Sequence, residues 1–285
     1  MAQVMGIVNV TPDSFSDGGL FLDAERAIEH GHELVAQGAA ILDVGGESTR
    51  PGADPVPASI ELGRTEPVVR ALAAADGPGA PVSIDTSKAE VAAAALDAGA
   101  ALVNDVTALR GDPDLAGLCA ERGCEVVLMH MLGEPRTMQD NPVYEDVVGD
   151  VKAFLAERTE AAIAAGIAEE RISLDPGIGF GKTLAHNLEL LRRLEELADL
   201  GRPLVVGTSR KRFIGALTGR EVTDRVGGTV ASNVLAVAAG ADVLRVHDVQ
   251  AVRQAVDVAE VILGRRPWRD TLAESKPTTT TTHRP

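Results

Sequence analysis

The chain has 285 residues, of which 45% are hydrophobic and 24% are charged, and its formal net charge is −15. This length suffices for one domain with a full apolar core, and the acidic balance argues against nucleic acid or an anionic membrane as a partner, because either needs a basic face. An anionic substrate would therefore have to be attracted by a local group of basic residues.

Apolar runs bounded by Gly, Pro and Asp predict eight short strands, and the amphipathic segments between them, rich in Ala, Leu, Glu and Arg, predict helices. The strands are expected at residues 4–9, 40–45, 82–85, 101–105, 125–130, 172–175, 204–208 and 243–247. The helices are expected at about 23–37, 58–75, 88–98, 113–122, 147–165, 184–199, 225–239 and 248–263.

Strand and helix alternate throughout, which predicts a single α/β domain, a (β/α)8 or TIM barrel, over residues 1–264. A doubly wound open sheet is the alternative, but such a sheet usually has fewer strands. After residue 264 the sequence has no apolar periodicity, and it ends in Lys276-Pro277, five Thr and a His-Arg-Pro. Residues 265–285 are therefore expected to form a disordered tail.

No apolar segment approaches the ~18 residues that cross a bilayer, and Met1 leads directly into the first strand without a basic region or a cleavage site. We therefore expect a cytoplasmic location. Cys119 and Cys124 are the only cysteines, and neither has a His or Cys partner at metal-ligand spacing. They are interpreted as free thiols in a reducing compartment.

Polar residues gather where the predicted strands end, at the rim where barrel enzymes place their active sites. Asn9, for example, ends the first strand and opens into a loop that contains Asp, Ser, Thr and one Phe, which is more polar than the burial of a strand requires. The strand-end set comprises Asn9, Glu47, Ser48, Thr49, Arg50, Asp85, Asn104, Asp105, His130, Asp175, Ser209, Lys211, Arg245 and His247.

Structural roles also explain some members of this set. Asp85 can cap the helix that follows it, Asn104-Asp105 can form a turn, and for His130 a place in the core is favoured over a ligand role. The set as a whole is more persuasive than any single member.

The loop 175–183 ends in Gly-Lys-Thr, as phosphate-binding P-loops do. The spacing excludes that motif, because Pro176 stands where a P-loop needs Gly. A tight turn that aims Asp175 and Phe180 into the barrel mouth fits better, since its glycines allow close approach of a ligand.

The strand-end groups indicate a ligand with two different parts. The acceptors Asp85, Asn104 and Asp175 suit a planar heterocycle that donates from amino and ring N–H groups, such as a pterin or a purine. Arg245 and His247, together with Asn9 and a metal ion, suit a phosphate.

The chain resembles the dihydropteroate synthases, the folate-pathway enzymes that sulfonamides inhibit, from about Val4 to Gly264. The resemblance rests on ordered motifs: MGIVNVTPDSFSDGG at 5–19, DVGGESTRPGA at 43–53, SIDTSKAEV at 83–91, NDVTALRGDP at 104–113, LDPGIGFGKT at 174–183, GTSRKRFIG at 207–215 and RVHDV at 245–249.

The resemblance implies a homodimeric barrel enzyme that joins a dihydropterin methyl diphosphate to 4-aminobenzoate in the presence of Mg²⁺, releasing diphosphate and dihydropteroate. The residues that it assigns to the pterin substrate are Thr49, Asp85, Asn104, Asp175 and Lys211 for the ring, with Arg245 and His247 for the diphosphate. Asn9 would help to ligate Mg²⁺.

For 4-aminobenzoate, the resemblance implies a pocket formed by Phe15, Arg50, Pro51, Phe180 and Ser209. The reaction is a displacement at a methylene carbon, and dissociation before attack is plausible because the pterin nitrogen can stabilise a cation there. Asp17 would stabilise this cation, and Lys211, Arg245 and His247 complete the catalytic set. An apolar patch around residues 230–246 is the candidate dimer contact.

Two other functions would share the heterocycle site. A pterin-binding methyltransferase with a corrinoid partner has no use for a diphosphate site, so the RVHDV motif at 245–249 counts against it. A non-catalytic paralogue that binds pterin is the second alternative, and the presence of Arg50, Lys211 and Arg245 counts against it.

Overall fold

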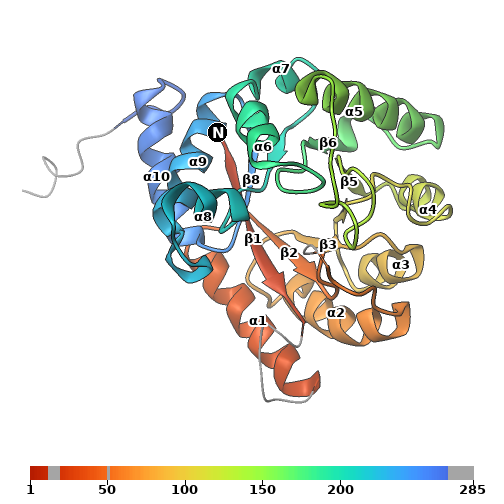
Figure 1. The fold of residues 1–285 in the computed structure, drawn as a ribbon. Helices are drawn as coiled ribbons and strands as arrows, with labels where there is room; N and C mark the ends of the chain where they lie inside the picture. The colour runs from red at the N-terminus through yellow and green to blue at the C-terminus, as the bar shows by residue number, and fades with distance from the viewer. Residues whose placement is uncertain (12–19, 50–51, 269–285) are drawn as a thin grey trace, which may run out of the picture.

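Eight parallel strands form a closed ring with helices around it in the computed structural model, which describes residues 1–11, 20–49 and 52–268 (Figure 1). The strands are β1 (Gln3–Asn9), β2 (Ile41–Gly45), β3 (Val82–Asp85), β4 (Leu102–Asp105), β5 (Glu125–Met129), β6 (Ile172–Asp175), β7 (Val205–Val206) and β8 (Val243–Val246). Their order is β6-β5-β4-β3-β2-β1-β8-β7. A bridge between Leu174 and Leu204 joins β6 to β7, which closes the predicted barrel.

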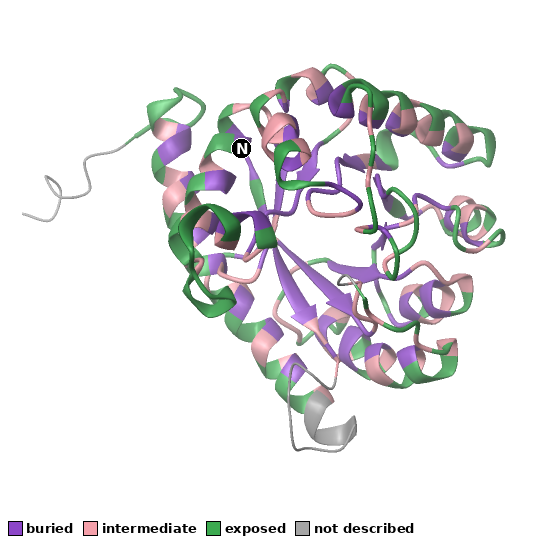
Figure 2. Ribbon diagram, viewed as in Figure 1, coloured by how far each residue is buried: buried purple, intermediate pink, exposed green. Residues whose placement is uncertain are grey.

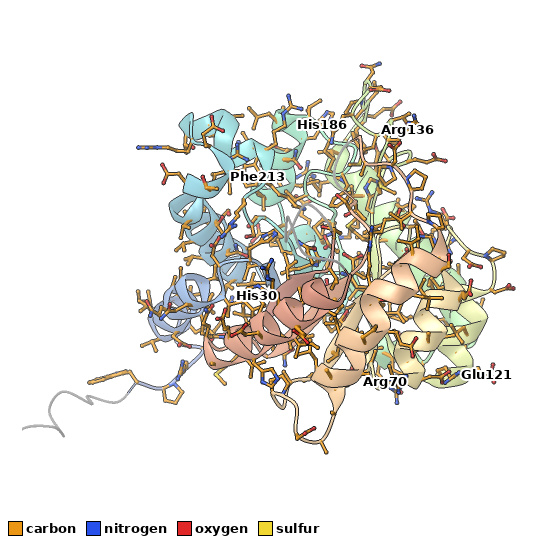
Figure 3. The ribbon with its side chains drawn as sticks, turned by 90° about the horizontal axis from the view of Figure 1, so that it is seen from below. His30, Arg70, Glu121, Arg136, His186 and Phe213 are labelled. Carbon is orange, nitrogen blue, oxygen red and sulfur yellow. The ribbon has the colours of Figure 1, made fainter. Side chains whose placement is uncertain are left out.

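The helices cover the outside of the ring, and most lie where the sequence predicts them. They are α1 (Leu20–Ala36), α2 (Ala58–Ala73), α3 (Ala89–Asp97), α4 (Leu115–Arg122), α5 (Val147–Ala164), α6 (Leu184–Arg192), α7 (Glu195–Ala198), α8 (Arg212–Thr218), α9 (Val226–Ala238) and α10 (Val249–Ile262), with short 3-10 turns η1 (Glu169–Arg171) and η2 (Val222–Asp224). Their outer faces carry charged side chains such as Arg70 and Glu121 (Figure 3).

The helices differ from the prediction in two places. The helix expected at 184–199 ends at Arg192, because Arg193 leaves the helical conformation with φ −110° and ψ 26° and bonds to Glu196 and Asp146. Helix α8 was not expected, since its seven residues are too short to show a helical period. It ends at Gly219, whose φ of 70° closes the helix in the left-handed conformation.

The barrel interior consists of an apolar floor with a charged layer above it. The floor is formed by Met5, Ile41, Leu102, Val127, Val205 and Val243, which are all buried (Figure 2). Because side chains alternate along a strand, the next inward positions lie two residues later, at Asp43, Asn104 and Arg245. The polar side chains therefore lie above the apolar layer, on the side of the barrel mouth.

None of the described helices is long and apolar enough to cross a membrane. Of the tail predicted from residue 265, the structure describes the first residues only, and the Arg265 guanidinium donates to the Val237 carbonyl at 2.5 Å. The domain boundary at residue 264 stays a prediction.

Candidate active site

Polar side chains from four strands, β2, β3, β4 and β8, come together around one guanidinium. Arg245 on β8 donates from Nε to Asp43 Oδ2 at 2.5 Å and from Nη2 to Asp85 Oδ2 at 2.6 Å. Asn104 on β4 donates from Nδ2 to the same Asp43 oxygen at 3.1 Å. Three predicted site residues, Asp85, Asn104 and Arg245, thus form one network through a residue that the sequence analysis missed.

That missed residue is Asp43, which is fully buried in the middle of β2. Its Oδ1 atom has no hydrogen-bond partner within the part of the chain that the structure describes. The sequence contained a signal, because a carboxylate inside the apolar run Ile41-Leu42-Asp43-Val44 is not needed for strand packing. A buried charge of this kind is normally paired, and Arg245 is its partner.

Burial and crowding perturb the charges of this network. Burial raises the pKa of Asp85 to about 7, although the charge of Arg245 acts in the opposite direction. Burial tends to lower the pKa of Arg245, but Asp43 and Asp85 outweigh it, and the resulting pKa is raised. Arg245 therefore stays a cation, while Asp85 titrates near neutrality.

Asp175, Phe180 and Lys211 meet at the mouth beside β6. Asp175 is buried and accepts a hydrogen bond at 2.6 Å from the Gly177 amide. The Lys211 ammonium donates to the Ile178 carbonyl and lies 4.7 Å from the centroid of the Phe180 ring. Burial lowers the pKa of Lys211 to about 8, with Asp175 opposing the shift. The loop after β6 is a turn at the mouth, as predicted.

Ser209 and His247 form a second pair on the β7–β8 side. The Ser209 hydroxyl lies 3.1 Å from His247 Nδ1, and the His247 amide donates to the same oxygen at 3.1 Å. This arrangement fixes the imidazole at the rim next to Arg245 on β8. Asn9, the last residue of β1, and Thr49, which follows β2, are both half-buried.

Three other strand-end residues have structural partners. Asp105 accepts bonds from the amides of Thr107 and Leu109, so it shapes the turn after β4. Glu47 pairs with Lys88, which also binds the buried Glu61 at 2.5 Å. His130 is buried and lies against Lys182, as the core interpretation expected.

Four predicted site residues lie outside the described residues: Phe15, Asp17, Arg50 and Pro51.

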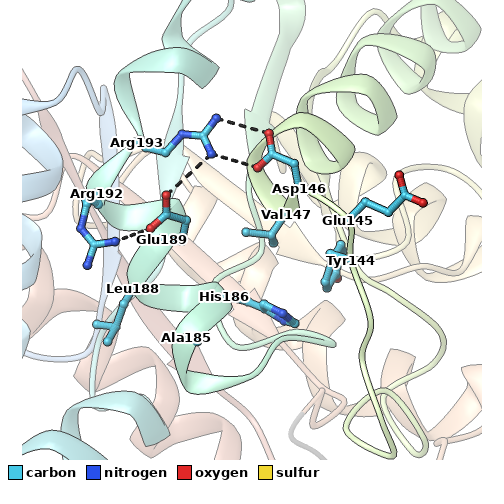
Figure 4. A pocket seen from close by; sticks show the side chains of 10 residues that line it. All are labelled: Tyr144, Glu145, Asp146, Val147, Ala185, His186, Leu188, Glu189, Arg192 and Arg193. Carbon is cyan, nitrogen blue, oxygen red and sulfur yellow. Dashed lines mark hydrogen bonds and ion pairs between the residues drawn. The ribbon is translucent and has the colours of Figure 1, made fainter.

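A surface cavity of about 480 Å³ lies away from the strand ends, between the start of α5 and α6 (Figure 4). Its charged lining is paired internally: Arg193 binds Asp146 at 2.9 Å and Arg192 binds Glu189. On its inner wall, the rings of Tyr144 and His186 meet edge to face with centroids 4.9 Å apart. Both arginines of this cavity are thus already paired with carboxylates, so the candidate active site remains the barrel mouth.

The donor set was also compared with what Mg²⁺ requires. Within residues 1–11, 20–49 and 52–268, no three acidic, His or Cys side chains converge as a metal cage. The Asn9 side chain makes no hydrogen bond to another described residue, so its amide oxygen is available. One protein oxygen is a poor resident site, but it fits an ion that arrives with a diphosphate, since Mg²⁺ keeps waters and binds phosphates.

The sequence profile described as "Pterin binding enzyme" matches residues 5–247. The dihydropteroate synthase of Synechocystis sp. is 46% identical over 267 residues, which cover 93% of this chain and 90% of that protein.

Two solved structures have the same fold. The dihydropteroate synthase of Xanthomonas albilineans with 4-aminobenzoic acid has a TM-score of 0.86 and 50% identity, covering 92% of this chain and 93% of that one. The enzyme of Yersinia pestis in a sulfonamide drug complex has a TM-score of 0.87 and 45% identity, covering 92% of this chain and 94% of that one.

Proposed function

We propose roles for the strand-end residues on the premise that this chain belongs to the pterin binding enzyme family and is a dihydropteroate synthase. It is a transferase of folate biosynthesis that condenses (7,8-dihydropterin-6-yl)methyl diphosphate with 4-aminobenzoate to give 7,8-dihydropteroate and diphosphate. The observation that supports the roles most directly is the guanidinium of Arg245, held between Asp43 and Asp85 at the mouth.

The pterin ring is assigned to the buried groups of β3, β4 and β6. Three acceptors are each less than a tenth exposed: Asp85, Asn104 and Asp175. Few water molecules compete with an N–H donor that reaches them. A pterin offers a fork of amino and ring N–H donors to such acceptors. Lys211 and Thr49 would complete this subsite, with the Lys211 ammonium beside Asp175.

The diphosphate is assigned to Arg245 and His247. Arg245 lies in β8 and His247 directly follows it, and the bond between Ser209 and His247 holds the imidazole at the rim. As the methylene carbon–oxygen bond breaks, negative charge grows on the leaving diphosphate, and two fixed donors stabilise that charge more than they stabilise the bound substrate. Asn9 would hold Mg²⁺, which, when bound, would supply further neutralisation of the diphosphate.

The 4-aminobenzoate is assigned to Phe180, Ser209 and Lys211, which are close to both the pterin and the diphosphate groups. Phe15, Arg50 and Pro51 would close this pocket, and Asp17 would stabilise the methylene cation. The aromatic amine is neutral at pH 7, so it attacks without a strong base and loses its proton after the new carbon–nitrogen bond forms. No enzyme nucleophile is needed.

We further propose a cytoplasmic homodimer. Exposed apolar side chains gather on α8, α9 and α10, where Leu217 is 57%, Leu235 68% and Ile262 79% exposed. A face of this kind suits a twofold contact with a second copy, and the mass in solution measured by light scattering tests it. The two thiols, Cys119 and Cys124, are buried and unpaired, which is usual in a reducing compartment.

The assay mixes the protein with the diphosphate substrate, 4-aminobenzoate and Mg²⁺ and follows dihydropteroate, with and without chelator. Arg245→Met should lower kcat/KM by about 2–4 kcal/mol of transition-state stabilisation. Arg212→Met, at an exposed position on the same rim, is the control and should change little. Unchanged turnover in Arg245→Met would refute its role. Absence of product with intact pterin binding would instead favour the non-catalytic or methyl-transferring alternative.

A further inference from the structure

The loop between β6 and α6 is held by side chains at every one of its carbonyls from Gly177 to Gly181. Lys182 donates to the carbonyls of Gly177 and Phe180, each at 3.0 Å. The remaining carbonyls are served by Lys211 on Ile178, by Gln139 on Gly179 at 2.8 Å, and by Tyr144 on Gly181 at 2.7 Å. A surface loop normally leaves such groups to water, so this loop is built to keep one shape.

The centre of the loop is a tight turn that presents Phe180. The Phe180 amide donates to the Gly177 carbonyl at 3.0 Å, and Gly179 has a φ of +87°, as the third residue of a type II turn requires. The turn has no spare room, because a Cβ on Gly177 would lie 1.9 Å from the His130 carbonyl oxygen. The position of the Phe180 ring therefore depends on what clamps this turn.

Two lysines hold the turn from opposite sides. Lys211 lies on the mouth side, where its stem passes 3.3 Å from the position of a Cβ on Gly179. Lys182 is only 3% exposed and reaches the turn from within the protein. Its ammonium spans both ends of the turn and also lies 2.8 Å from His130 Nδ1. One ammonium thus uses three acceptors to join the turn to the end of β5.

Packing alone does not explain why a lysine is buried at this place. No carboxylate among the described residues forms an ion pair or hydrogen bond with Lys182. Burial lowers the pKa of Lys182 well below its ordinary value, although the charge of Asp175 acts in the opposite direction, because a buried ammonium loses more hydration than neutral acceptors usually return. An apolar side chain of similar length would fill the same space more cheaply. The hydrogen bonds of the Lys182 side chain fix the distances between Gly177, Phe180 and His130.

We propose that Lys182, with His130 as its anchor, is a positioning residue for the 4-aminobenzoate subsite. It sets the turn so that Phe180 and the Lys211 stem form one wall of that subsite. Lys182 does not touch either substrate. This proposal rests on the proposed function, in which Phe180 lines the pocket for 4-aminobenzoate.

The test compares Lys182→Met with Tyr144→Phe. Lys182→Met should raise KM for 4-aminobenzoate on the order of tenfold, less than the roughly 10²-fold that a 1 Å misplacement of a reacting group can cost. The Kd of the pterin substrate, measured by calorimetry, should stay within about twofold, because a general loss of packing would weaken both sites alike. Tyr144→Phe removes a bond that lies beyond Phe180 and should leave both values unchanged.

Phe180→Ala separates failure of the proposal from failure of the proposed function. If Phe180→Ala raises KM for 4-aminobenzoate and Lys182→Met does not, the positioning role is overturned while the subsite stands. If neither changes it, the subsite itself is misassigned. Equal changes in KM and pterin Kd for Lys182→Met also overturn the proposal.

Gln139→Ala provides a second variant at a half-exposed position, in case Lys182→Met does not fold. It frees the Gly179 carbonyl within the same turn and should raise KM for 4-aminobenzoate by about threefold, as expected for one neutral hydrogen bond. An unchanged KM would argue that the turn does not control the subsite.

Discussion

Replacing Arg245 with Met should destabilise the barrel, and more strongly at high pH than at low pH. Methionine keeps part of the stem and removes the guanidinium that binds Asp43 at 2.5 Å and Asp85 at 2.6 Å. The two carboxylates are 0% and 9% exposed, which places these pairs among buried ones. Loss of one partner of a buried pair costs about 3–5 kcal/mol, because the other charge is left without compensation.

This loss should be smaller at lower pH, because Asp85 can take up a proton there. Its pKa in the folded chain is about 7, compared with 3.8 for a free carboxyl. A carboxyl whose pKa is raised by folding contributes stability below its unfolded value and loses it as pH rises through the folded value. Arg245 holds this pKa down, so the variant should be protonated at Asp85 over an even wider range.

Urea unfolding at pH 6 and pH 8.5, followed by circular dichroism, measures the effect. We expect the full loss of about 3–5 kcal/mol at pH 8.5 and roughly half of it at pH 6, where Asp85 is largely neutral in both proteins. Arg122→Met, which removes an exposed pair with Asp97, should leave the midpoint nearly unchanged at both pH values. An equal loss at pH 6 and pH 8.5 would refute the assignment of the titration to Asp85.

Two further predictions concern ligand binding and turnover. Asp175→Asn should weaken the binding of pterin itself, because an amide accepts hydrogen bonds at one atom where the carboxylate accepts at two; equal calorimetric affinity for both proteins would contradict the role of Asp175. For the unmodified enzyme, kcat/KM should decline above pH 8, because Lys211, with a pKa of about 8, loses its positive charge there. A profile that stays flat to pH 9.5 would show that turnover does not need this ammonium.

The sequence sufficed for the barrel because its signals are local and repeated. Each strand is an apolar run with a turn residue at its end, and each long helix has several periods of apolar residues. Helix α8 escaped because it is only seven residues long. The break at Arg193 was not predicted, because its bond to Asp146 joins residues far apart in sequence, and its bond to Glu196 does not show in a hydrophobic pattern.

The candidate site was predictable where a polar residue ends a strand, as with Asp85, Asn104 and Arg245. The parallel register brings such ends to one rim without further information. The supporting residues were not predictable in the same way. Asp43 is hidden within an apolar strand, and Lys182 stands in a motif that suggests phosphate, although its ammonium faces the protein interior. Asp43 bonds to Arg245 and Lys182 to His130, and such contacts between residues far apart in sequence depend on the folded structure.

The junction between β6 and β7 has the fewest backbone contacts of the ring. These strands meet through the bridge between Leu174 and Leu204, whereas the other neighbours share longer ladders. Asp175 stands on one side of this junction, and Ser209 with Lys211 follows on the other. The Lys211 ammonium donates across this junction to the Ile178 carbonyl. At this point the ring is therefore joined by a side chain as well as by backbone, between the strand ends that carry Asp175 and those that carry Ser209 and Lys211.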